Sequence, residues 1–389
     1  MKVPTAVMIS ARRSAVGRIG GLHRNRRLED LAAPVLTAAL VDARCDASSV
    51  EGLVLGNVTA GGNPARAVAL ASGLPEISFA ISVDSQCASG LDAIVAAFRR
   101  IHAGEVDVVV AGGAESLSTA PWRIARPKNQ FQMPHFIGVE PQSADLNGDC
   151  IAFEASEVLA RQLSITRGDQ DAYTAQSHLA AGVARDRRQF FGEIAAVRVN
   201  PEEMRDQHNA TAGIDDLSEL TAFQPVDGSL TPGNTSALAD GAAFGVIVSG
   251  KIWRDLGSPK GLVLHRSASC GAPAASAALA GLAALQLLLR RGGDEAARIA
   301  PMLAVVETSE ASAAEAIAII RSLALADGAM NAGGGAVVRG HPLAAASAIS
   351  VVRLFTRLIR SDKPLGRSGC VLQGAIGGLG VAASFEAIG

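Results

Sequence analysis

Two residues in this chain of 389 could act together as a nucleophile and its proton acceptor, Cys87 and His341. Cys87 lies in DSQCASGLDAI, where small residues precede apolar residues at helical spacing, so the cysteine is predicted to sit where a helix begins. Unpaired backbone N–H groups and the helix dipole favour an anion there, which predicts a lowered thiol pKa and a populated thiolate. The alternative is that Cys87 is a small buried apolar residue.

His341 occupies a comparable place in the last third of the chain. The run GHPLAAASAISVVRLFTRLIR puts it at a turn before a helix, and GCVLQGAIGGLGVAASFE then supplies a pair of strands. Cys87 is likewise followed by a helix and by the strand VDVVVAGG. This duplication predicts two similar α/β halves whose equivalent turns face one site, where an imidazole can take the proton of a thiol. Alone, His341 would be interpreted as a hydrogen-bonded structural histidine.

Hydrophobic patterning predicts the elements that position these two residues. Gly90, directly after the cysteine turn, predicts a close backbone approach at the start of the helix. The elements predicted ahead of the cysteine are a strand at 5–10, a helix at 28–43, a strand at 52–55 and a helix at 65–72. Those predicted in the second part are a helix-then-strand run at 236–250, a helix at 274–289 and a strand at 302–307.

The stretch between these two parts has a different character. Prolines interrupt the chain after residue 116, and helices are predicted only near 154–163 and 169–190. This strand-poor pattern predicts an insertion laid over the main body, consistent with a lid. We therefore divide the chain into an N-terminal half, 1–250, with a loop domain inserted at about 117–233, and a C-terminal half, 251–389.

Composition limits the class of protein. Apolar residues make up 49% of the chain and charged residues 19%, with 41 glycines, which indicates a globular α/β protein. The net charge of -2 argues against nucleic acid or an acidic membrane as the main partner. There is no run of 18 apolar residues and no apolar stretch after a basic start, so a soluble, cytoplasmic protein is expected.

Cysteines and N-terminal arginines are two further sets of residues that could take part in chemistry. The five cysteines are scattered, with no CxxC pair, which predicts neither a disulfide framework nor a metal site. Six arginines gather near the N-terminus: Arg12, Arg13, Arg18, Arg24, Arg26 and Arg27. They could bind phosphate groups, or they could form an ion-paired surface.

Several segments together follow a known family pattern: SARRSAVGRIGGLHRNRRLEDLAAPVL, DSQCASGLDAI, VVVAGGAESLSTAP, LTPGNTSALADGAA and NAGGGAVVRGHPLAAA. Through them the chain resembles the thiolases, the acetyl-CoA acetyltransferases and 3-ketoacyl-CoA thiolases, over essentially its whole length. The resemblance implies the α/β thiolase fold: two similar α/β halves in a five-layer αβαβα arrangement of two mixed sheets, with an inserted loop domain that holds CoA. It further implies an acyl-CoA or acyl-carrier thioester as partner, coenzyme A thioester as substrate, no permanently bound cofactor, and a homodimer or homotetramer.

The resemblance also implies roles for particular residues. Cys87 matches the cysteine that takes up the acyl group as a thioester, and His341 matches the histidine that activates it and helps hold the substrate thioester oxygen. Ser236 matches a serine against the pantetheine arm of CoA. Backbone N–H groups of Cys87 and of about Ile376 match an oxyanion hole, where donors fixed on the backbone need no reorganisation as charge develops.

Other positions depart from the family pattern. Gly374 stands where thiolases carry a second cysteine that moves the α-proton of the substrate, and Cys370 could replace it only if the strand register slipped. The family's Asn-Glu-Ala-Phe motif, whose asparagine orients a catalytic water, corresponds to Ser309 through Ser312. Ile151 and Thr221 stand at the positions where many thiolases carry a CoA-contacting histidine and an adenine-contacting arginine.

These matches and departures favour a thiolase-like acyltransferase that forms an acyl-Cys87 intermediate from an acyl-CoA, with His341 as base and altered or weakened Claisen and thiolysis chemistry. One alternative is a catalytically degenerate homologue that acts as a binding or scaffold subunit. Another is a biosynthetic condensing enzyme that uses a carrier-protein thioester. Without a base at Gly374, His341 would act alone, or the substrate would arrive activated, for example as a malonyl-type thioester that loses CO2.

Overall fold

The computed structural model describes residues 5–389 apart from 138–151, 199, 208–213, 292–301 and 363–365. Its strands are β1 (Ala6–Arg13), β2 (Gly17–Arg18), β3 (Gly52–Gly56), β4 (Phe79–Val83), β5 (Val108–Glu115), β6 (Ile124–Ala125), β7 (His135–Phe136), β8 (Ala239–Ser249), β9 (Gly261–Gly271), β10 (Val306–Glu307), β11 (Ser368–Ala375) and β12 (Leu379–Ile388). Its α-helices are α1 (Leu28–Ala43), α2 (Pro64–Ala71), α3 (Ser89–His102), α4 (Ala152–Gln162), α5 (Arg167–Asp186), α6 (Gly250–Asp255), α7 (Ala280–Arg290), α9 (Ala313–Leu323), α10 (Ala336–Arg339) and α11 (Leu343–Phe355).

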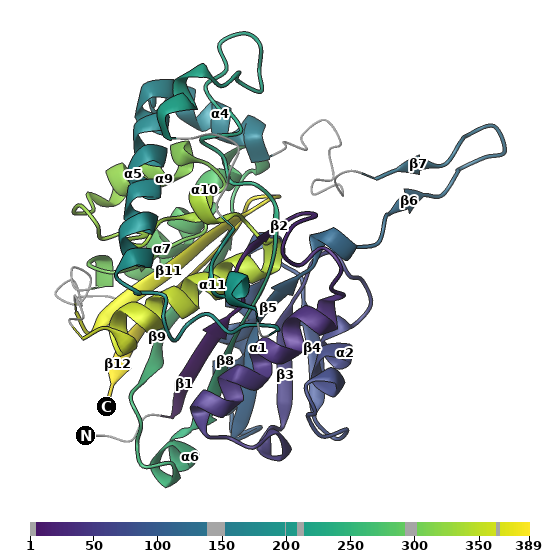
Figure 1. Cartoon of the computed structure of the whole chain (residues 1–389), viewed down its shortest axis with the longest axis vertical. Coiled ribbons are helices and arrows are strands. Elements are labelled where there is room, and N and C mark those ends of the chain that lie inside the picture. The colour runs from purple at the N-terminus through teal and green to yellow at the C-terminus, as the bar shows by residue number, and fades with distance from the viewer. Residues whose placement is uncertain (1–4, 138–151, 199, 208–213, 292–301, 363–365) are drawn as a thin grey trace.

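Ten of the described strands form one continuous sheet, and its two parts, one from each half of the chain, are called the first and the second sheet below. In the first half, β3 is parallel to β4 and β5, whereas β8 is antiparallel to both β5 and β1. In the second half, β10 is parallel to β11, and β12 is antiparallel to β11 and β9. The halves meet where Met8 of β1 pairs with Leu262 of β9, giving the continuous order β10-β11-β12-β9-β1-β8-β5-β3-β4 (Figure 1).

Helices cover both sheets in layers, as the family resemblance implied. Outer helices α1 and α2 pack on one face of the first sheet, and α7 and α9 pack on the outer face of the second. Between the sheets lie α3 and α11, whose apolar side chains share one core with strands of both halves. In this middle layer Phe98 of α3 contacts Phe385 of β12, with ring centroids 6.2 Å apart. The five-layer αβαβα prediction is therefore confirmed.

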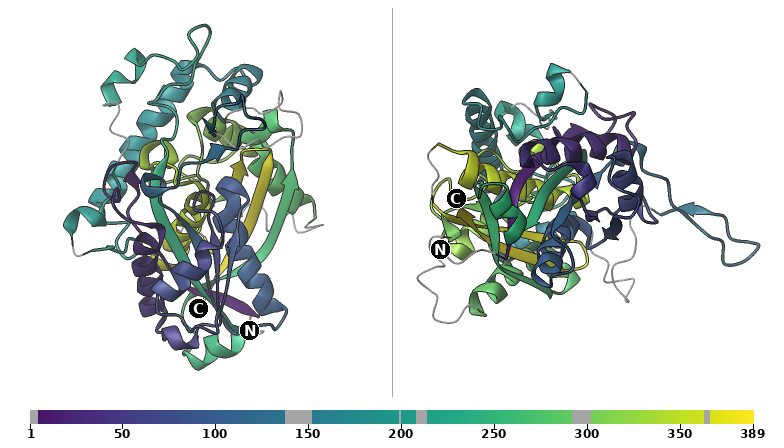
Figure 2. Two further views of the ribbon diagram at one scale, coloured as in Figure 1. Left: turned by 90° about the vertical axis from the view of Figure 1, so that its right-hand side faces the viewer. Right: turned by 90° about the horizontal axis from the view of Figure 1, so that it is seen from below.

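The insertion between β5 and β8 lies over one end of this body. Figure 1 shows α4 and α5 at the end of the molecule opposite α6, and Figures 1 and 2 show the β6–β7 hairpin projecting away from the body. Buried ion pairs fix the insertion: Arg13 of β1 pairs with Glu193 at 2.9 Å and with Asp206 at 2.6 Å, and Arg353 of α11 pairs with Glu193 at 3.0 Å. The two predicted helices of this region are confirmed as α4 and α5.

Most other predicted elements are present, with two corrections. The helix-then-strand run predicted at 236–250 is wrong, because β8 is one continuous strand from Ala239 to Ser249. A strand buried on both faces gives an unbroken apolar run, which periodicity alone cannot distinguish from a buried helix. The strand predicted at 302–307 is confined to Val306–Glu307. The division of the chain at residue 250 stays a prediction.

Among the N-terminal arginines, the ion-paired interpretation is correct for four. The pairs are Arg12–Asp42, Arg13–Glu193 and Arg13–Asp206, Arg26–Glu203, and Arg27–Glu29. These guanidinium groups therefore serve the fold. In the described part of the chain, no helix is both long and apolar enough to cross a membrane.

Candidate active site

Cys87 lies on a single 3-10 turn, Gln86–Ala88, that leads directly into α3. This confirms its predicted place at a helix start. Gly90, in the first turn of α3, touches α11 so closely that a Cβ there would stand 2.5 Å from the carbonyl oxygen of Ala344. The predicted close approach at Gly90 is thus also confirmed. Because no side chain separates them, the N-terminal ends of α3 and α11 bring the cysteine and histidine turns together.

His341 lies just ahead of α11 and is held from two sides. Its backbone N–H donates to the carbonyl of Ala237 at 2.8 Å, which ties it to the segment leading into β8. Its ring Nδ1 lies 3.2 Å from the hydroxyl oxygen of Ser309. When Nδ1 carries the proton and donates it to this hydroxyl, Nε2 is left as the basic atom of the ring.

One cavity of about 410 Å³ joins most of the predicted site residues. Its wall includes Cys87, Ser236, His341, Gly374 and Ile376. Ser309 does not line it and instead supports His341 from behind. Thr221 is exposed and does not line the cavity, and Ile151 lies outside the described residues. The structure therefore brings together Cys87, His341 and Ser236, the residues to which the resemblance assigns the roles of nucleophile, base and pantetheine contact.

Burial dominates the ionisation of both central groups. It raises the pKa of Cys87 to about 12, and the carboxyl groups of Glu315 and Glu115 add to this, whereas the backbone N–H groups of Cys87 and Ile376 oppose it. The predicted lowering of the thiol pKa is therefore wrong, because desolvation outweighs the helix start. Burial, and then the charge of Arg339, lowers the pKa of His341 to about 4, so its imidazole is neutral at pH 7 and can accept a proton.

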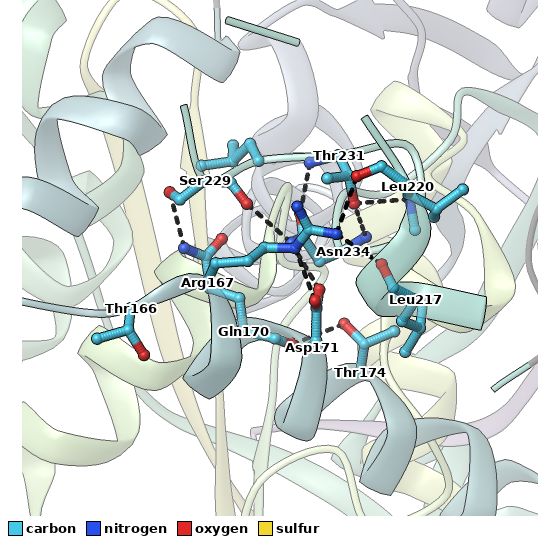
Figure 3. Close-up of polar contacts among 12 residues, drawn as sticks. Thr166, Arg167, Gln170, Asp171, Thr174, Leu217, Leu220, Ser229, Thr231 and Asn234 are labelled. Atoms are coloured by element: carbon cyan, nitrogen blue, oxygen red, sulfur yellow. Dashed lines mark hydrogen bonds and ion pairs between the residues drawn. The ribbon is translucent and has the colours of Figure 1, made fainter. Parts of the chain in front are cut away.

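A polar network in the insertion positions the cavity wall that carries Ser236. Figure 3 shows Arg167 and Asp171 of α5 directed at the segment 229–234: Asp171 accepts from Arg167 at 2.6 Å and from the Asn234 amide at 3.0 Å. Beyond it, the Ser236 N–H donates to the Ala311 carbonyl at 2.9 Å, and its hydroxyl donates to the Glu310 carbonyl at 2.6 Å. Ser236 is thus hydrogen-bonded to the segment that precedes α9. Its hydroxyl oxygen can still accept a hydrogen bond from a molecule in the cavity.

The position of the absent second cysteine is closed by backbone. A Cβ on Gly374 would lie 2.8 Å from the carbonyl oxygen of Ala277, closer than real contacts allow. Cys370 does not compensate, because β11 pairs with β12 in regular register, Cys370 with Ser384 and Gly374 with Gly380. Cys370 lies on the same face of β11 as Gly374, but four residues earlier in the strand, where it packs in the core beneath α7 and α9 and does not line the cavity. The prediction that the register does not slip is confirmed.

Two polar cavity residues were missed from the sequence. Glu315, in the first turn of α9, is only 3% exposed, and burial raises its pKa to about 8. Ser156 of α4 lines the same cavity, and its hydroxyl is buried with no hydrogen-bond partner in the described structure. The available signal was a single glutamate in the otherwise apolar run AAEAIAII. Nothing in the sequence marked Ser156. Within the described residues, no group of His, Cys, Asp and Glu side chains could hold a metal ion.

The chain is similar to members of a known protein family. The model of the thiolase N-terminal domain matches residues 6–251, and that of the thiolase C-terminal domain matches residues 262–387. An acetyl-CoA acetyltransferase of Pseudomonas aeruginosa is 32% identical over 387 residues, covering 95% of this chain and 97% of that protein. A probable acetyl-CoA acyltransferase of Staphylococcus aureus is 30% identical over 367 residues, covering 90% and 92%.

Solved structures agree with this placement. Acetyl-CoA acetyltransferase of Bacillus anthracis superposes with a TM-score of 0.86 at 28% identity, covering 99% of each chain. Human mitochondrial 3-ketoacyl-CoA thiolase in complex with CoA superposes with a TM-score of 0.87 at 26% identity, covering 100% of this chain and 99% of that one. The family models span both halves and the fold agrees over the whole chain. The protein therefore belongs to the thiolase family.

Proposed function

We propose that this protein is an acyltransferase that takes the acyl group of an acyl-CoA, or of a related thioester, onto Cys87. The observation that carries the proposal is the meeting of Cys87, a neutral His341 and the backbone N–H of Ile376 at one cavity. The names of the relatives, acetyl-CoA acetyltransferase and acetyl-CoA acyltransferase, support the choice of donor.

In the proposed first step, Sγ of Cys87 bonds to the thioester carbonyl carbon while its proton passes to Nε2 of His341. The carbon–sulfur bond to CoA then breaks, and the leaving thiolate takes that proton, so the products are S-acyl-Cys87 and free CoA. Because the thiol pKa is about 12 and the imidazole pKa about 4, the two groups do not form an ion pair at rest. Proton transfer must therefore accompany attack, which is the situation in which a positioned base accelerates reaction.

The oxygen of the tetrahedral intermediate needs donors that are already in place. The backbone N–H groups of Cys87 and Ile376 both hydrogen-bond toward the cysteine sulfur, which is why they act to lower its pKa. An oxygen on the carbon bonded to that sulfur lies within reach of the same donors. Such fixed donors are worth about 3–4 kcal/mol of barrier each in other acyl-transfer enzymes.

The remaining cavity wall suits a long, mostly apolar arm. Phe153 and Phe223, both in the lining, stack with ring centroids 4.9 Å apart, while Ser236 and Ser156 supply isolated hydroxyl groups. A pantetheine or acyl chain has this composition. As part of the proposal, the loop domain holds CoA, and the protein forms a homodimer or homotetramer, which light scattering after gel filtration tests.

Claisen condensation and thiolysis are proposed to be altered or weakened. Both reactions move a proton at the α-carbon, and the position that carries the family's base for this task is Gly374. Transfer of the acyl group to an oxygen, nitrogen or thiol acceptor moves no such proton. The acyl-enzyme step is therefore the firmest part of the proposal.

The test is intact-protein mass spectrometry after brief incubation with acetyl-CoA, acetoacetyl-CoA and longer acyl-CoAs, with Cys87→Ser as the matched control. We expect a mass gain of one acyl group in the wild type and none in the variant. An adduct that persists in Cys87→Ser would refute the assignment of the nucleophile. No adduct from any CoA ester or acyl-carrier thioester would favour a binding or scaffold subunit instead.

A further inference from the structure

We infer that Glu315 is a second acid-base residue of the cavity and moves the α-proton of a bound acyl thioester, a task for which position 374 has no side chain. This inference rests on the proposed function and goes beyond it, since the acyl-enzyme step needs no such group. In the step, the α C–H bond breaks, the proton bonds to the carboxylate of Glu315, and the electron pair remains as an enolate. The enolate then either recovers a proton, or bonds to the acyl carbon on Cys87 and releases the Cys87 thiolate.

The position of Glu315 is fixed by the start of its helix. Ser312 caps α9, its hydroxyl accepting from the Glu315 N–H at 3.2 Å, and the Ala313 N–H donates to the Asn234 carbonyl at 2.9 Å. The first turn of α9 is thus tied to the same segment that carries Ser236 into the cavity. A carboxylate on this turn is held in place before any substrate arrives, as a catalytic base must be.

The surroundings of the carboxylate leave it available for proton transfer. One oxygen, Oε2, accepts from the Ala311 N–H at 2.8 Å, and no lysine, arginine or histidine pairs with it within the described structure. Two other buried glutamates have cation partners: Glu193 pairs with Arg13 and Arg353, and Glu307 pairs with Arg357. Glu315, by contrast, is held by one backbone donor, the Ala311 N–H.

The ionisation of Glu315 suits a group that both takes and returns a proton. Burial is the largest cause of its raised pKa, which lies at about 8, and the neighbouring carboxyl of Glu310 adds to it. A group with a pKa near the working pH is the most effective general acid-base catalyst. The other titratable groups of the cavity are Cys87 and His341, and at neutral pH neither carries a charge in the free protein.

A purely structural role for Glu315 makes a different prediction. Ser312 and Glu315 have the spacing of a capping box, in which a glutamate or glutamine at the third helical position accepts a backbone N–H at the helix start. Glutamine would do this as well, without placing a carboxylate where its charge raises the pKa of Cys87. A negative charge there hinders formation of the thiolate, so capping alone does not explain the choice of glutamate.

Glu315→Gln separates the two roles, because it keeps the shape and the cap and removes the base. The matched control is Asp169→Asn, which makes the same carboxylate-to-amide change at the equivalent position of the capping box of α5, away from the cavity. Each protein is incubated in ordinary water with acetyl-CoA deuterated on its methyl group. Two readouts are taken from the same samples: acylation of Cys87 by intact mass, and deuterium loss from recovered acetyl-CoA.

We expect Glu315→Gln to acylate Cys87 at least as fast as the wild type. We expect its rate of deuterium exchange to be lower than that of the wild type by about 100-fold or more. Asp169→Asn should match the wild type in both readouts. The inference is overturned if the deuterium exchange rate of Glu315→Gln is within about threefold of the wild-type rate. It is also overturned if Asp169→Asn slows the exchange as much as Glu315→Gln does. A wild-type protein that acylates Cys87 but shows no deuterium exchange would overturn it as well. If the wild type does not acylate at all, the proposed function fails first, and that failure is seen separately in the mass readout.

Discussion

The two sides of the cavity differ in how they are built. On one side, the turns that carry Cys87 and His341 are set by backbone contacts, with Gly90 against the Ala344 carbonyl and the Ile376 N–H directed at the cysteine sulfur. On the other side, Gly374 is covered by the Ala277 carbonyl, and Glu315 projects from the start of α9. The first side carries the cysteine and the histidine that the family resemblance indicated. The second side has Gly374 in place of the family's second cysteine, and it carries the carboxylate of Glu315, which the resemblance did not indicate. The comparison teaches that the proposed acyl transfer and the proposed α-proton transfer depend on separate walls of the cavity, so substitutions on each wall should change them separately.

The largest effect is expected on the first side, from His341→Asn. Asparagine retains a polar atom near Ser309 but removes Nε2, so the thiol of Cys87, with a pKa of about 12, loses its proton acceptor. We expect acylation by acetyl-CoA to slow by about 10²- to 10⁴-fold. Quenched time courses read by intact mass measure it. A rate within about threefold of the wild type would remove His341 from the mechanism.

On the second side, Glu315 predicts a pH-dependent stability. Its pKa rises from 4.5 to about 8 on folding, so the folded protein binds this proton more tightly than the unfolded chain. Its stabilising contribution is complete below about pH 4.5 and is lost as the pH rises toward 8, an effect of at most about 5 kcal/mol in the free energy of unfolding. Denaturant unfolding of wild type and Glu315→Gln at several pH values measures the difference. Parallel pH dependence in the two proteins would contradict a raised pKa.

A smaller effect is expected from restoring a side chain at position 374. In Gly374→Cys the new Cβ meets the Ala277 carbonyl, so α7 and the turn before it must shift. We expect a loss of about 1–3 kcal/mol in the free energy of unfolding, with a similar loss for the matched Gly374→Ala. If Gly374→Cys folds with full stability and exchanges α-protons faster than the wild type, the second side is less closed than described.

The smallest effect is expected from Ser309→Ala, which lies behind the first side. It removes the hydroxyl beside Nδ1 of His341 without touching the cavity wall. The loss of one neutral hydrogen bond should cost about 0.5–1.5 kcal/mol, so acylation should slow by about two- to tenfold. A loss as large as that of His341→Asn would show that Ser309 does more than orient the ring.

Local patterns in the sequence predicted most of the fold, and they failed where tertiary burial competed. The predicted helix at 28–43 coincides with α1, and the glycine after the cysteine turn marked a real close approach. The Ala- and Gly-rich run of β8 misled the prediction because it is buried on both faces. A helix start was rightly expected at Cys87, yet its pKa depends on desolvation by residues far along the chain.

The site was predictable where a motif surrounds the residue and not where only packing identifies it. Cys87, His341, Ser236 and Ile376 stand in recognisable runs, and the structure gathers all four at the cavity. Glu315 looks like an ordinary helix-capping residue in sequence, and only the fold shows that it lines the same cavity as Cys87 and Gly374. The absence of a base at 374 was visible in sequence, whereas the place of Glu315 in the wall of the same cavity was not.

The most direct test of this account is to locate the acyl group after a single turnover. Wild-type protein is mixed briefly with the preferred acyl-CoA, quenched in acid and digested, and each cysteine-containing peptide is examined by mass spectrometry. The account predicts an acyl group on the peptide with Cys87, sensitive to hydroxylamine as a thioester is, and unmodified Cys45, Cys150, Cys270 and Cys370. An acyl group on another residue, with Cys87 unmodified, would contradict it.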